Sequence, residues 1–135
     1  MTIKAWLTGT PEYLRTAQQG IPSTGLTASG TTQAGALQLT TDFNVFTTVA
    51  SSQSCVLLGA LDTTYAGTPG VNQGPCDLAD TIVVVNHGAQ TLSVFPNGTG
   101  KIANGSASAA FSVAATKTCT FMYIGSGNWA ASLSA

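Results

Sequence analysis

The sequence has very little charge. Among its 135 residues there are four Lys and Arg and five Asp and Glu, so 7% of the chain is charged, against about 25% in a typical soluble domain. A nucleic-acid-binding protein needs clustered cations to neutralise phosphates, and a coiled coil needs charged residues on its outer faces. The composition therefore excludes both classes. The chain also lacks a hydrophobic run of the roughly 18 residues that a membrane-spanning helix requires, so we expect no membrane partner.

Cysteine and histidine are also scarce, which leaves few ligands for a metal. The three cysteines, Cys55, Cys76 and Cys119, are irregularly spaced and form no Cys-x-x-Cys pair. Structural zinc sites depend on closely spaced ligand pairs, so we expect neither a metal nor a cofactor. Cys119 lies in an alternating pattern that predicts a buried thiol in a strand. A Cys55–Cys76 disulfide stays open as an alternative, although a reducing cytoplasm disfavours it.

The residues that could carry catalysis are few and scattered. His87 is the only histidine, and its neighbours in sequence offer no nucleophile for it to activate. A glycosidase needs two carboxylates across a cleft, for which Asp62, Asp77 and Asp80 are candidates, but Asp is also a common turn residue. Residues 98–101 contain Gly and Lys without the spacing of a phosphate-binding loop. We therefore expect the protein not to be an enzyme.

Short apolar segments separated by turn residues dominate the rest of the sequence. Hydrophobic residues make up 44% of the chain, with 15 Gly and five Pro, and the many β-branched Thr residues favour strands over helices. This rhythm predicts an all-β fold, a single antiparallel sandwich or jelly roll of about eight strands. The expected strands are 31–39, 45–49, 55–58, 81–85, 91–95, 110–113, 118–124 and 129–133. We expect 42–44 to be a turn, and 81–85 to form a hairpin with 91–95.

The length of the chain fits one domain. Residues 1–25 differ in composition and predict an N-terminal arm before a β domain at 26–135, although an ordinary first strand and loop stays open. Segment 59–79 exceeds the usual length of a connection, which indicates a functional loop or a contact loop. Candidate interface residues in these two segments are Trp6, Leu7, Tyr13, Leu14, Arg15 and Tyr65. The first residues lack the pattern of a signal peptide, so we expect synthesis in a cytoplasm.

From residue 25 onward the sequence resembles a small β domain of virion proteins of tailed bacteriophages. The resembling pieces are turn and core residues, at 30–34, 42–44, 47–50, 80–89, 92–96, 109–113 and 127–129, together with Leu39. Such domains occur as separate proteins or at the ends of fibre-type chains. The resemblance brings no catalytic residues with it, and it implies a place in the virion.

A short separate chain with an arm and a β body is similar to a capsid cement or decoration protein. The resemblance implies a homo-oligomer, a dimer or trimer, that binds the major capsid protein on the capsid surface and stabilises the lattice. A surface of small uncharged polar residues, which repels copies of itself only weakly, agrees with this. The alternative is a head- or tail-fibre module that attaches to a host-surface glycan. A small glycan hydrolase is a third, weaker hypothesis.

Overall fold

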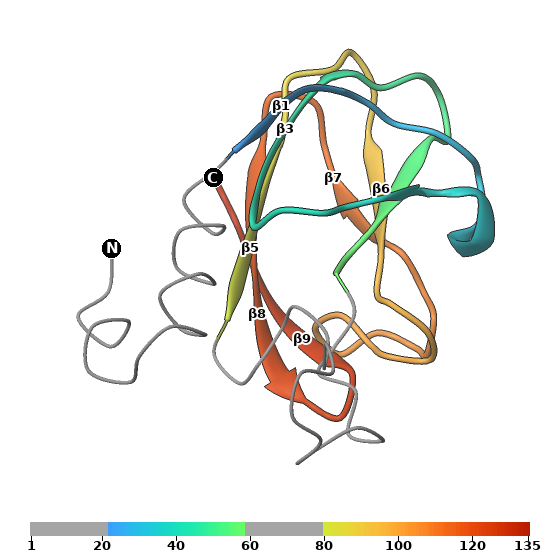
Figure 1. Ribbon diagram of the computed structural model, residues 1–135, viewed down its shortest axis with the longest axis vertical. Coiled ribbons are helices and arrows are strands. Elements are labelled where there is room, and N and C mark those ends of the chain that lie inside the picture. The colour runs from blue at the N-terminus through green and yellow to red at the C-terminus, as the bar shows by residue number, and fades with distance from the viewer. Residues whose placement is uncertain (1–21, 59–79) are drawn as a thin grey trace, which may run out of the picture.

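The computed structural model describes residues 22–58 and 80–135, which form nine strands and one short 3-10 helix (Figure 1). The strands are β1 (Ser23–Thr27), β2 (Leu37–Gln38), β3 (Phe43–Thr48), β4 (Ser54–Val56), β5 (Thr81–Asn86), β6 (Leu92–Phe95), β7 (Phe111–Val113), β8 (Thr118–Gly125) and β9 (Asn128–Leu133), and the helix η1 is Gln33–Gly35. Within these two ranges no helix is long and apolar enough to cross a membrane. The expected all-β fold is confirmed. Residues 23–25, which the composition grouped with the arm, begin β1.

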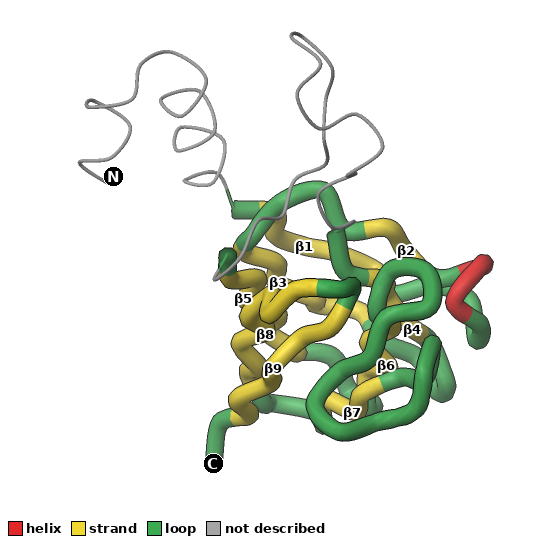
Figure 2. Tube along the Cα trace, turned by 90° about the horizontal axis from the view of Figure 1, so that it is seen from below, coloured by secondary structure: helices red, strands yellow, loops and turns green. Residues whose placement is uncertain are grey.

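The strands form two sheets that face each other across one hydrophobic core (Figure 2). The five-stranded sheet has the order β1-β3-β5-β8-β9, and the four-stranded sheet has the order β2-β4-β6-β7. Each sheet therefore has one face turned to the core and one face turned outward.

The connectivity differs from the expected antiparallel arrangement. From β1 to β6 successive strands alternate between the two sheets, so that β1, β3 and β5 are parallel neighbours, as are β2, β4 and β6. Only the last three strands, β7, β8 and β9, run antiparallel to their neighbours. The expectation of antiparallel sheets throughout was wrong, because strands that follow one another in sequence pass to opposite sheets instead of pairing.

The hairpin expected between residues 81–85 and 91–95 is also absent. β5 lies in the five-stranded sheet and β6 in the four-stranded sheet, and the chain crosses between them at 87–91. The Asn86 side chain bends this crossing. Its Oδ1 accepts a hydrogen bond from the Gly88 N–H at 2.9 Å, and its Nδ2 donates to the carbonyl oxygens of Gln90 and Val113 at 2.8 and 2.9 Å. Asn86 thus forms a corner between the sheets, where the sequence suggested a tight turn.

A further correction concerns residues 42–44. Phe43 and Asn44 are the first two residues of β3 and pair with Val83 and Val84 of β5. Asn44 is buried, and its Nδ2 donates to the Thr41 carbonyl oxygen at 2.9 Å. The polar side chain that suggested a turn is therefore bonded within the fold while its backbone continues the sheet.

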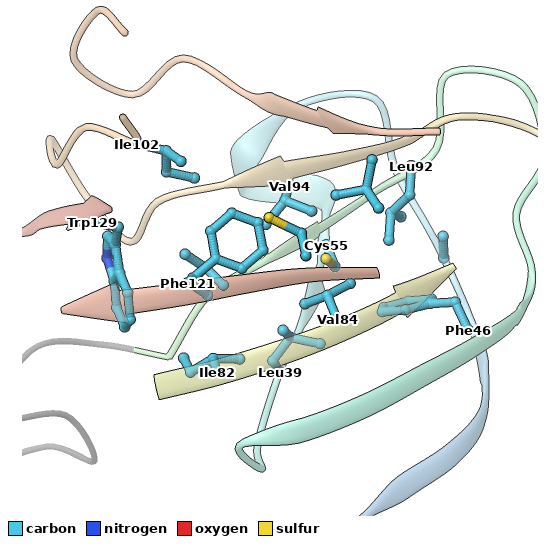
Figure 3. Close-up of a cluster of buried hydrophobic side chains, with 14 of the residues drawn as sticks. Leu39, Phe46, Cys55, Ile82, Val84, Leu92, Val94, Ile102, Phe121 and Trp129 are labelled. Atoms are coloured by element: carbon cyan, nitrogen blue, oxygen red, sulfur yellow. The ribbon is translucent and has the colours of Figure 1, made fainter. Parts of the chain in front are cut away.

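The core is built from side chains of both sheets (Figure 3). Its largest fully buried members are Trp129, Phe46, Phe121, Leu39, Leu57, Ile82 and Leu92. The Tyr123 and Trp129 rings meet edge to face, with centroids 5.2 Å apart, a favoured aromatic geometry. Cys119 was expected to be a buried thiol, and this prediction is confirmed.

A tight turn joins the antiparallel strands β8 and β9. Ser126 and Gly127 join the strands and have φ of 55° and 76°, and positive φ at both central residues is the requirement of a type I′ turn. This turn packs against the loop before residue 101. A Cβ placed on Gly100 would lie 1.9 Å from the carbonyl oxygen of Gly127.

Replacing Gly100 with alanine is expected to lower the free energy of unfolding by about 1–3 kcal/mol, because the two backbones must separate to admit a methyl group. Gly35→Ala is the matched control, since a Cβ there would meet its nearest neighbour at an ordinary 3.6 Å. Urea unfolding of both variants measures the difference. Equal stabilities would contradict the close approach of the two loops.

Candidate protein-binding surface

The catalytic candidates do not form a site among the described residues. His87 is exposed in the crossing between the sheets, and its backbone N–H donates to the Phe46 carbonyl oxygen at 2.8 Å. Across residues 22–58 and 80–135, no group of three His, Cys, Asp or Glu side chains is placed to hold a metal. Of the three predicted carboxylates, Asp80 is described, whereas Asp62 and Asp77 lie outside these ranges.

The two described cysteines are core residues. Cys55 and Cys119 are buried free thiols, one in each sheet. Burial raises the pKa of both thiols, that of Cys119 to about 11. Since the thiolate is the reactive form, neither side chain suits nucleophilic chemistry. Cys76, the other half of the possible disulfide, lies outside the described residues.

The environment of the Asp42 carboxyl disfavours its charge. Burial raises the pKa of its carboxyl, the Asp42 backbone N–H partly opposes this, and the charge of Asp80 raises the pKa further. Its Oδ1 is buried, and no hydrogen-bond partner is found for it in the described part of the chain. The Asp42 backbone is nevertheless held in place, because its carbonyl oxygen accepts a hydrogen bond from the Val83 N–H at 2.7 Å.

Replacing Asp42 with asparagine is expected to stabilise the protein at pH 7 by less than about 1 kcal/mol, since solvent screens much of the effect. A carboxyl whose pKa is raised on folding supports stability below its ordinary value of 3.8 and loses that support as pH rises through the folded-state pKa. The gain in stability from Asp42→Asn should therefore shrink as the pH falls through the folded-state pKa of Asp42, and it should disappear below the ordinary value of 3.8. Thermal unfolding at a series of pH values measures it, and a gain that persists in acid would contradict the cause given.

The interface residues expected from the sequence belong to two segments. Both segments that carry them, 1–21 and 59–79, lie outside the described residues. These residues are Trp6, Leu7, Tyr13, Leu14, Arg15 and Tyr65.

The outward side of the five-stranded sheet is the most unusual surface of the described fold. In β5 the side chains alternate, so that Ile82 and Val84 are buried while Val83 and Val85 face outward. The register continues this row across the sheet, with Val83 between Phe43 of β3 and Thr120 of β8. We call this surface the outer face. It comprises Phe43, Val45, Thr47, Thr81, Val83, Val85, Thr118, Thr120, Met122, Ile124, Ala130 and Ser132.

Large hydrophobic side chains are exposed on this sheet. Phe43, Met122 and Ile124, all on the outer face, are 41%, 42% and 54% exposed, and Leu133 of the edge strand β9 is 44% exposed. Among the described residues, no other large hydrophobic side chain is exposed to this degree. An antiparallel or mixed sheet with one face in water usually carries polar residues there. The outer face therefore has the chemistry of a surface that another protein covers.

The outer face is also free of charge. Within residues 22–58 and 80–135 the charged side chains are Asp42, Asp80, Lys101 and Lys117, and all four lie in segments between strands. The polar positions on the face are Thr and Ser, whose hydroxyl groups can both donate and accept hydrogen bonds. Depletion of charge with enrichment of Met and aromatic residues is typical of the core of a protein interface.

No protein-family model, no curated protein and no solved structure matches the chain. The chemistry of the outer face is thus the structural observation that bears most directly on function. The sequence predicted a self-associating uncharged surface from composition alone, but it did not locate one. A signal was present in 81–85, where four of five residues are apolar and both sides of the strand are therefore hydrophobic.

Proposed function

We propose that the protein is a non-enzymatic structural component of a bacteriophage virion, a capsid cement or decoration protein that oligomerises and binds the outer capsid lattice. The described residues form its body, a two-layer β-sandwich. The observation that carries the proposal is the uncharged outer face with its exposed Phe43, Met122 and Ile124. A surface of this kind is suited to a protein that works while packed against other proteins.

The phage setting is supported by the resemblance of the sequence to small β domains of tailed-phage virion proteins. Several of the resembling residues have structural roles in the fold. Asn86 forms the corner between the sheets, Trp129 fills the core, and Asn128 closes the β8–β9 turn. These residues maintain a stable body, which a protein that reinforces a capsid against internal pressure needs.

The test is the copy number of the protein in purified virions that encode it, measured by quantitative staining against the major capsid protein. A lattice component occurs in a fixed, high proportion to that protein, because each symmetry-related site takes one oligomer. A few copies per particle would place the protein on the tail or on fibres, where a glycan ligand becomes the better explanation. Absence from virions would overturn the virion proposal.

A further inference from the structure

We propose that two copies of this chain pack through the outer faces of their five-stranded sheets, related by a twofold axis near Val83. This proposal deepens the proposed function, on which it rests, by assigning the self-association of the protein to one surface. It concerns described residues only.

The absence of charge is the first reason to choose a second copy as the partner. In a twofold interface the same patch meets itself, so a residue near the axis faces its own copy. Any charged residue in the middle of such a patch meets a like charge, which is costly once the interface excludes water. The outer face carries none. A different protein is usually recognised and oriented by complementary charges, and the outer face offers no charge for this purpose.

The side chains on the face suit the packing of two sheets. Val83 occupies the central strand, flanked by Phe43 and Thr120, and side chains from two such faces can interdigitate as they do inside a β-sandwich. Met122 is unbranched and adaptable, and it can fill gaps between the two layers. The Thr hydroxyl groups can pair with Thr hydroxyl groups of the second copy, since each can donate and accept.

The size of the face sets the expected strength of the dimer. The residues of the outer face lie on four strands, which are about 4.8 Å apart and about six residues long and give a plane of roughly 19 by 20 Å. Two copies therefore cover roughly 800 Å² in total, less than most stable specific interfaces and in the range of weak, transient ones. We expect a reversible dimer with a dissociation constant in the micromolar range, well suited to a protein that completes its assembly on a larger lattice.

Sedimentation equilibrium of the full chain between about 1 and 100 µM tests the proposal. The wild type should change from monomer to dimer within this range. Thr120→Lys places a charge beside Val83, where the two copies would bring like charges together, and should raise the dissociation constant at least tenfold. Ser112→Lys is the matched control. Ser112 is exposed on the outward side of β7 in the other sheet, so this variant should dimerise as the wild type does.

Cross-linking provides a second readout that does not depend on a charge. In a Cys76→Ser background, Val83→Cys should form a disulfide-linked dimer on mild oxidation, because the two Val83 positions lie near the axis. Ser112→Cys should not, and the buried Cys55 and Cys119 should not contribute. Circular dichroism confirms that each variant is folded.

The outcomes separate this proposal from the proposed function. A monomeric wild type at 100 µM, or a dimer that Thr120→Lys leaves intact, would overturn the assignment of the outer face, whatever the copy number in virions. A dimer that Thr120→Lys dissociates, from a protein absent from virions, would support the assignment and overturn the phage function.

Discussion

Replacing Trp129 with alanine is expected to lower the free energy of unfolding by about 3–5 kcal/mol, the range found when a buried aromatic residue is truncated. Trp129 is 1% exposed and stacks edge to face on Tyr123. Its backbone is also bonded on both sides, since its N–H donates to the Lys101 carbonyl oxygen and its carbonyl oxygen accepts from the Ala103 N–H, each at 2.8 Å. The cavity left by Trp129→Ala would therefore lie where β9 meets residues 101–103, in the loop between β6 and β7 of the other sheet.

Urea unfolding followed by circular dichroism measures the loss, and Ala130→Ser is the matched control. Ala130 neighbours Trp129 in β9 but is exposed on the outer face, so its substitution should change stability by less than about 0.5 kcal/mol. If Trp129→Ala cost no more than this control, Trp129 would not be a core residue and the position of β9 would be wrong.

Replacing Asn86 with aspartate is expected to destabilise the protein by about 3 kcal/mol or more at pH 7. The change keeps the oxygen that accepts from Gly88 but removes the amide that donates to the carbonyl oxygens of Gln90 and Val113. A buried carboxylate would then face two carbonyl oxygens. Both burial and these oxygens disfavour its charge, so the folded-state pKa of the new carboxyl is raised. The loss should shrink in acid, where the carboxyl is protonated and can donate one hydrogen bond.

Gln90→Glu is the control for Asn86→Asp, because it makes the same chemical change four residues away. The Gln90 side chain is exposed, and the carbonyl oxygen that Asn86 contacts belongs to its backbone. Its substitution should change stability by less than about 0.5 kcal/mol. Equal effects of the two substitutions would show that Asn86 does not form the corner between the sheets.

The sequence predicted most strands but not how they pair. Segments 81–85 and 118–124 become β5 and β8 with almost the expected ends, because apolar β-branched and aromatic runs between turn residues are a local signal. The pairing of β3 with β5 joins residues about 40 positions apart in sequence, as in Phe43 with Val83. No local pattern encodes such a contact. The proposed hairpin after β5 failed because Asn86 uses its side chain to turn the chain into the other sheet.

The outer face shows the same division between local and non-local information. Alternation in 118–124 places Met122 and Ile124 on one side of a strand, which the sequence shows directly. Whether that side faces the core or water depends on which sheet lies behind it. In the structure Phe121 and Tyr123 fill the core, so Met122 and Ile124 face outward. Only the assembled sheet brings them together with Phe43 and Val83 on one uncharged surface.

The most direct test of the central claim, that the outer face works by binding protein in the virion, is the copy number of three forms of the protein in purified particles. The account predicts that the wild type and Ser112→Lys are present in the same fixed proportion to the major capsid protein, and that Thr120→Lys is reduced at least tenfold. Incorporation of Thr120→Lys at the wild-type level, with all three proteins folded, would contradict it.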